Sequence, residues 1–140
     1  MVIDTGMAGA HRMLDIIRRI CRAMPGVAED IKWGNDLVFS VGGRMFAVVC
    51  VDPPHSISFK CTAEDFGELV ERPGMIPAPY LARALWVQEQ ALGDVLQQGE
   101  LEHLIRSSYD LVVAKLPQSR KPGAHTKGRV RRKGTQRRRS

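Results

Sequence analysis

Residues 24–61 read MPGVAEDIKWGNDLVFSVGGRMFAVVCVDPPHSISFKC and contain three runs in which apolar residues alternate. The runs are Leu37, Phe39 and Val41; Met45, Ala47, Val49 and Val51; and Ile57, Phe59 and Cys61. Alternation with a period of two is typical of strands that bury one face. Gly42-Gly43 predicts a tight hairpin turn, and Asp52-Pro53-Pro54 predicts a second break. The stretch therefore predicts an antiparallel meander.

Helical patterns flank this meander on both sides. Apolar residues spaced by three and four predict an amphipathic helix over about 10–24, behind a loose leader at 1–9, and a second helix over 100–116. Thr62 followed by Asp65 predicts the start of a short helix, and residues 85–90 predict a final strand. We expect one α+β domain over 10–117, a two-layer sandwich in which helices cover one face of an antiparallel sheet.

The last strand of the meander indicates what the other face of the sheet carries. Ile57 and Phe59 point to one side, whereas Ser56, Ser58 and Lys60 point to the other, which we expect to be wet. On the later strand, Trp86 falls on the polar side. Its ring is either covered by a loop, the interpretation that we favour, or available for stacking.

The charge of +6 is unevenly distributed along the chain. Residues 118–140 contain ten of the 21 Lys and Arg residues and none of the 15 acids, so residues 1–117 carry 11 cations against 15 anions, a net charge of −4. Few apolar residues occur beyond Pro117, and we expect a disordered basic tail there. A basic tail indicates a polyanionic partner, whereas the body is mildly acidic.

The remaining composition argues against several classes of protein. The three cysteines form no C-x-x-C motif, which favours buried thiols in a reducing cytoplasm over disulfides or a zinc site. No apolar stretch is long enough for a membrane span or a signal peptide. The four histidines are far apart, and no motif indicates a catalytic residue, a metal site or a cofactor. We expect a cytoplasmic protein that is not an enzyme.

Several stretches together resemble the MmcQ/YjbR-like family of small bacterial proteins. They occur in the same order over about residues 12–117: MPGVAEDIKWG, VFSVGGRMFAVV, ISFKC, ERPGMIPAPYL, the isolated Trp86, and SYDLVVAKLP at 108–117. The resemblance implies a CyaY/frataxin-like α/β fold and a DNA-binding protein. One departure is that Ala82-Arg83-Ala84-Leu85-Trp86 stands where family members often have Asn-Lys-x-His-Trp. A site built on that Asn and His is lost here.

Our leading hypothesis is a non-enzymatic protein that binds DNA with low sequence specificity, mostly through the tail. The alternative is a small-molecule or protein-binding module with a solubilising basic tail. Basic side chains beside an aromatic ring suit phosphate contact and base stacking. The candidate residues are Lys32, Lys60, Arg83 and Trp86 in the body, and Arg120, Lys121, Lys127, Arg129, Arg131, Arg132, Lys133, Arg137, Arg138 and Arg139 in the tail.

Overall fold

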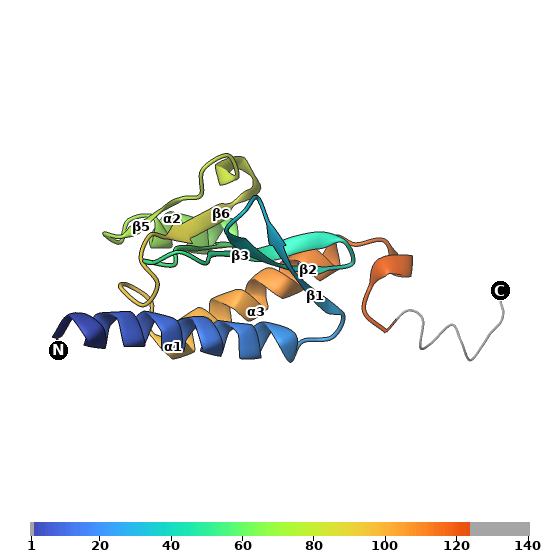
Figure 1. The fold of residues 1–140 in the computed structure, drawn as a ribbon. Helices are drawn as coiled ribbons and strands as arrows, with labels where there is room; N and C mark the ends of the chain where they lie inside the picture. The colour runs from blue at the N-terminus through green and yellow to red at the C-terminus, as the bar shows by residue number, and fades with distance from the viewer. Residues whose placement is uncertain (1, 124–140) are drawn as a thin grey trace, which may run out of the picture.

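The structure, a computed structural model, describes residues 2–123, without the side chains of residues 2–8 and 10 (Figure 1). Its helices and strands are, in chain order, α1 (Val2–Arg22), β1 (Val27–Lys32), β2 (Asp36–Val41), β3 (Arg44–Cys50), β4 (Ile57–Lys60), α2 (Ala63–Leu69), β5 (Met75–Pro77), β6 (Trp86–Glu89) and α3 (Gln98–Ala114). Two short 3-10 helices follow β5 and α3, η1 (Ala82–Ala84) and η2 (Gln118–Arg120).

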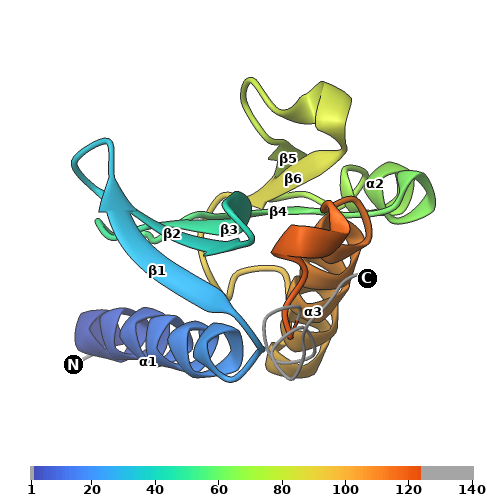
Figure 2. The same cartoon turned by 90° about the vertical axis from the view of Figure 1, so that its right-hand side faces the viewer.

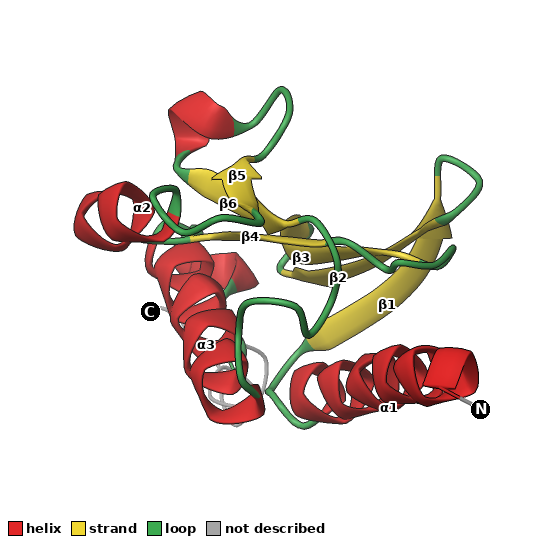
Figure 3. Ribbon diagram, turned by 90° about the vertical axis from the view of Figure 1, so that its left-hand side faces the viewer, coloured by secondary structure: helices red, strands yellow, loops and turns green. Residues whose placement is uncertain are grey.

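The strands form one open sheet in the order β1-β2-β3-β4-β6-β5, and every neighbouring pair is antiparallel. α1 and α3 lie side by side under one face of this sheet, whereas α2 packs near β5 and β6 (Figures 2 and 3). The α+β class and the antiparallel sheet are therefore confirmed. The CyaY/frataxin-like arrangement stays a prediction.

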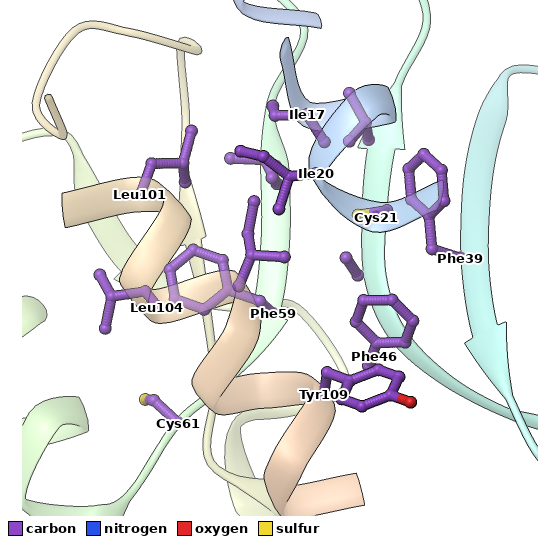
Figure 4. Packing of buried hydrophobic residues seen from close by; sticks show 14 of the residues in the cluster. Ile17, Ile20, Cys21, Phe39, Phe46, Phe59, Cys61, Leu101, Leu104 and Tyr109 are labelled. Carbon is purple, nitrogen blue, oxygen red and sulfur yellow. The ribbon is translucent and has the colours of Figure 1, made fainter. Parts of the chain in front are cut away.

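The core fills the space between the sheet and the two long helices. Ile17 and Ile20 of α1, Leu101 and Leu104 of α3, and Phe59 of β4 belong to one buried cluster (Figure 4). α1 is also tied to the sheet edge, because Glu29 of β1 forms ion pairs with Arg18 (2.8 Å) and Arg22 (2.6 Å). Two of the arginines on the polar face of α1 are thus engaged within the fold.

The predicted start of the first helix is wrong. The predicted leader at 1–9 is helical, since α1 begins at Val2. Gly6 and Gly9 lower the intrinsic helix propensity of this segment, which is why the pattern does not indicate a helix. Pro73-Gly74 and Pro77 predict an irregular segment, but residues 75–77 form the strand β5. β5 lies at the sheet edge, where Pro77 is tolerated because an edge strand does not need every N–H.

A β-bulge in β3 changes which residues face the core. The register with β2 shifts between Phe39↔Ala47 and Ser40↔Met45, so Phe46 has no direct partner. Phe46 and Ala47 are consecutive, and both are buried in the core. Strict alternation along residues 45–51 predicts that Phe46 shares a face with Val48, and this is wrong, because the bulge moves the Phe46 ring to the helix side.

A hydroxyl group replaces one rung of the central ladder. β3 and β4 pair directly from Val49↔Ile57 to Ala47↔Phe59, and the next rung would join Phe46 to Lys60. There the Lys60 N–H donates to Ser108 Oγ (3.0 Å), and the Ser108 hydroxyl donates to the Phe46 carbonyl (2.6 Å). Ser108 is fully buried. Its side chain from α3 thus bridges two strands that begin to separate at this point.

The loop before α3 is held by a buried carboxylate. Glu89 of β6 is fully buried, and it accepts hydrogen bonds from the backbone N–H groups of Gly93 (3.3 Å), Val95 (2.8 Å) and Leu96 (2.8 Å). These three donors satisfy the buried carboxyl oxygens, which have lost their contact with water. Glu89 therefore has a structural role.

The first part of the predicted tail is packed against the body. Residues 118–123 form η2 and the turn after it, with Pro122 near Gly26. At Gly42, where φ is +59°, a Cβ atom would lie 2.8 Å from the Arg120 carbonyl oxygen. The prediction of a tail beginning at 118 is thus wrong for 118–123. The predicted disorder of 124–140 lies outside the described residues.

We predict that Ser108→Ala destabilises the protein by about 2 kcal/mol, because it leaves a buried N–H and a buried carbonyl without a partner. Urea unfolding measures this change. Ser107→Ala, next to it on the same helix but partly exposed, is the control and should stay within about 0.5 kcal/mol. Equal effects of the two variants would contradict the bridging role.

Candidate functional site

A cleft of about 390 Å³ opens at the end of the sheet where β3 and β4 separate beyond Ser108. We call it the cationic cleft, because three cations and no acid line it. Its walls come from the start of β3, the end of β4, the start of β6 and the last turns of α3. The lining residues are Arg44, Met45, Lys60, Ala84, Trp86, Leu111, Val112, Lys115 and Leu116.

Lys60 is held in place inside this cleft. Its Nζ donates to the Ala84 carbonyl (2.6 Å), and the side chain is half-buried. Burial lowers the pKa of Lys60, and the nearby charge of Lys115 lowers it further. Two like charges therefore face one partly desolvated space, and an anion bound between them would relieve their repulsion.

Trp86 forms part of the cleft wall beside Lys60. The two residues are cross-strand partners of β6 and β4. Only 5 % of Trp86 is exposed, so the prediction that its ring is covered is confirmed. Arg83 is exposed on η1, next to Ala84 of the cleft lining. Lys60 and Trp86 thus come together in the cleft, and Arg83 is next to one of its lining residues in the chain.

The fourth body candidate lies elsewhere. Lys32 is at the end of β1, an edge strand that contributes no residue to the cationic cleft. Ser58, on the face that we expected to be wet, is only 8 % exposed. Its hydroxyl accepts a hydrogen bond from Gln88 (3.2 Å), and Val38 and Val48 continue the same cross-strand row. The face of the sheet that carries Ser58 is therefore more apolar than the alternating pattern of β4 predicts.

Two tail candidates lie at the cleft end of the molecule. Arg120 is exposed on η2, whose backbone packs against Gly42, and Gly42 also contacts Leu116 of the cleft lining. Lys121 Nζ lies 3.5 Å from the Ala114 carbonyl at the end of α3. The other tail candidates lie outside the described residues: Lys127, Arg129, Arg131, Arg132, Lys133, Arg137, Arg138 and Arg139.

Sequence reasoning missed Arg44 and Lys115 as members of this site. Arg44 directly follows the Gly42-Gly43 turn and is the first residue of β3. A cation at the start of a predicted strand could have been recognised from the sequence as a candidate site residue. Lys115 is far from Lys60 along the chain, and only the packing of α3 against β3 and β4 brings the two together. No local pattern could indicate that proximity.

The thiols of Cys21 and Cys61 and the imidazole of His55 lie inside the fold. Burial raises the pKa of the Cys21 thiol to about 12 and that of the Cys61 thiol to about 11, so both are protonated at neutral pH. His55 is buried, and its Nδ1 donates to the Cys50 carbonyl (3.1 Å). Its ring lies 5.3 Å from that of His11, centroid to centroid. His55 therefore contacts a backbone carbonyl and a second imidazole.

Among the described side chains, no group of three or more His, Cys, Asp or Glu residues is placed to bind a metal ion. None of the helices in the described part of the chain combines the length and the apolarity that crossing a membrane requires.

Comparisons with known proteins agree with this architecture. The model of the YjbR family matches residues 22–111. A crystal structure of a Deinococcus radiodurans protein with a DUF419 domain is similar, with a TM-score of 0.69 and 28 % identity over 76 % of this chain and 83 % of that one. A Pseudomonas syringae protein shares the fold, with a TM-score of 0.52 and 24 % identity over 61 % of this chain and 86 % of that one. No curated protein sequence matches.

We predict that Lys115→Ala raises the pKa of Lys60, because removing a neighbouring cation favours the protonated amine. The pKa stays below its ordinary value, since burial is the larger cause. The pH titration of the Lys60 Cε resonance by NMR measures this shift. Lys121→Ala is the matched control, and an equal shift there would contradict the proximity of Lys60 and Lys115.

Proposed function

The chain belongs to the YjbR family, and we propose that it is a DNA-binding protein of low sequence specificity that contacts phosphates through the cationic cleft and the basic C-terminal segment. One observation carries the proposal. Arg44, Lys60 and Lys115 converge on a cleft without acids, at the end of the fold where the chain continues into residues 124–140. That segment adds eight Lys and Arg residues and no acid.

The chemistry of the cleft suits phosphate groups. Arg44 offers a planar set of N–H donors, and the two lysines act as point charges. Contacts of this kind position a nucleic acid without reading its sequence. Counterion release from the phosphates supplies much of the affinity, which therefore falls as salt rises.

The body alone is a weak partner for a polyanion. Its net charge over residues 1–117 is −4, so the cationic cleft is a local exception on an acidic surface. We therefore assign most of the affinity to the basic segment and the orientation of the complex to the cleft. As part of the proposal, we place the protein in a bacterial cytoplasm, since its three cysteines are free, as in a reducing compartment.

The walls of the cleft support one alternative function. Trp86, Leu111 and Val112 make them apolar, and 390 Å³ lies within the range of small-molecule sites. A small anion with an apolar body would fit this combination of cations and apolar walls. In that case the basic segment would act only as a solubilising appendage, and ligand binding would not depend on it.

We predict that replacing the eight cations of 124–140 with glutamine weakens DNA binding about tenfold or more at moderate salt. Six to ten phosphate contacts in the unmodified chain give a log–log salt slope of about −5 to −9, and this slope should fall by most of its value. The replacement leaves 118–123, which pack on the body, unchanged. Fluorescence anisotropy across a salt series measures both quantities.

The matched control is a chain in which residues 124–140 are scrambled, with their composition kept. It should bind like the unmodified protein, because counterion release depends on charge and not on sequence order. Unchanged affinity in the glutamine variant would refute the role of the segment.

We predict a smaller, local effect for Arg44→Gln combined with Lys115→Gln. Each lost phosphate contact should reduce the salt slope by about 0.9 and weaken binding of all DNA sequences alike. The control is Arg12→Gln combined with Arg19→Gln, which removes the same charge from exposed positions of α1. If both double variants weaken binding equally, net charge and not the cleft is responsible.

A further inference from the structure

A second hollow lies on the sheet face that α1 and α3 leave uncovered. The β1–β2 turn and the segment from β5 through η1 rise on either side of this face, with the sheet between them (Figures 2 and 3). A groove of about 360 Å³ runs between them, and we call it the open-face groove. Met45, Val48 and Ser58 belong to its floor, and Trp33 and Tyr80 line it from the two raised segments.

Both of these aromatic rings are exposed to solvent. Trp33 is 69 % exposed, and Tyr80 is exposed completely. In a protein that buries Phe39, Phe46 and Phe59 fully, two bare rings beside one groove are unusual. Exposed aromatic residues lose the stabilisation that burial would give them, so they indicate an interaction surface.

The backbone at both positions is strained. Trp33 has φ = +51° and Tyr80 has φ = +67°, in the left-handed region where glycine is favoured. A bulky side chain at such a position is an outlier that costs stability. The chain thus holds a large ring at each of two positions where glycine would be more stable, and neither ring is used in the core.

The groove adjoins the cationic cleft. Met45 lines both, so the apolar floor of one continues to the cations of the other. Lys32 directly precedes Trp33, and in the register of β1 with β2 it is opposite Asp36, the one acid that lines the groove. A ligand lying across this face would therefore meet two ring surfaces, an apolar floor and then a group of cations.

We infer that the open-face groove binds the unpaired bases of a single-stranded nucleic acid, stacked on Trp33 and Tyr80, while its phosphates reach Arg44, Lys60 and Lys115. This inference rests on the proposed function and names the strand state of its ligand. Bases in a duplex stack on each other, so their faces are not available, whereas a single strand offers them freely. Rings that stack bases beside a cationic surface are the combination that sequence-tolerant single-strand binding requires.

The test compares a labelled single strand of mixed sequence with the same strand annealed to its complement, using the full chain. Trp33→Ala and Tyr80→Ala should each weaken single-strand binding about tenfold, the range expected for one lost stacking contact, and leave duplex binding unchanged. Trp33→Phe and Tyr80→Phe keep a ring and should retain most of the affinity.

Glycine substitutions at the same positions distinguish a loss of binding from a loss of folding. Trp33→Gly and Tyr80→Gly relieve the positive-φ strain, so the melting temperature should hold or rise while single-strand affinity falls as in the alanine variants. A loss of affinity together with a loss of stability would contradict the account of strained, functional rings.

Two other outcomes would overturn the inference. If the protein binds both probes and the alanine variants leave both affinities unchanged, the groove is not a base-stacking surface, although the proposed function stands. If the protein binds neither probe at low salt, the proposed function fails, and this inference fails with it.

Discussion

The hydroxyl of Ser108 makes the contact on which the arrangement of the cationic cleft depends. It accepts a hydrogen bond from the Lys60 N–H and donates one to the Phe46 carbonyl, so it stands where β3 and β4 would otherwise bond directly. The two strands stay part of one sheet and yet separate. The cationic cleft opens in this gap, with Lys60 on one side and Met45 on the other. Ser108 of α3 thus holds the backbones of Phe46 and Lys60 at the point where the buried core ends and the cleft opens.

The features that stabilise the fold and those of the proposed binding surfaces lie in different parts of the molecule. The helix face of the sheet buries its aromatic rings and satisfies Glu89 with three backbone donors. The open face carries two exposed rings on strained backbone, and the cleft holds like charges close together. Exposed rings on strained backbone and close like charges cost stability, and under the proposed function a bound nucleic acid would relieve or use each of them.

The sequence predicts the fold well where local patterns decide it. Alternation places β2, β3 and β4, and the Thr62 cap is present, since the Asp65 N–H donates to its hydroxyl (3.1 Å). The pattern fails where tertiary contacts decide. The bulge at Phe46 reverses the facing of one residue in β3, and the edge strand β5 is too short and too rich in proline to show alternation.

The candidate site is only partly predictable for the same reason. Lys60 and Trp86 could be paired as polar-face residues of two strands, but Lys115 joins them only through the packing of α3. The sequence pattern predicts Trp33 at the end of a strand and Tyr80 in a helical turn, whereas both residues lie in turns of the structure. Their exposure and their positive φ values belong to the folded backbone, which no residue pattern in these turns reveals.

The most direct test of this account uses the two tryptophans of the chain. Trp33 lines the open-face groove and Trp86 lines the cationic cleft, so their indole N–H signals in a ¹⁵N NMR spectrum report the two surfaces separately. When a single-stranded oligonucleotide is titrated into the full chain, we expect both signals to shift at the same ligand concentration. Binding that shifts backbone signals of residues 124–140 and leaves both indole signals in place would contradict the proposed roles of the groove and the cleft.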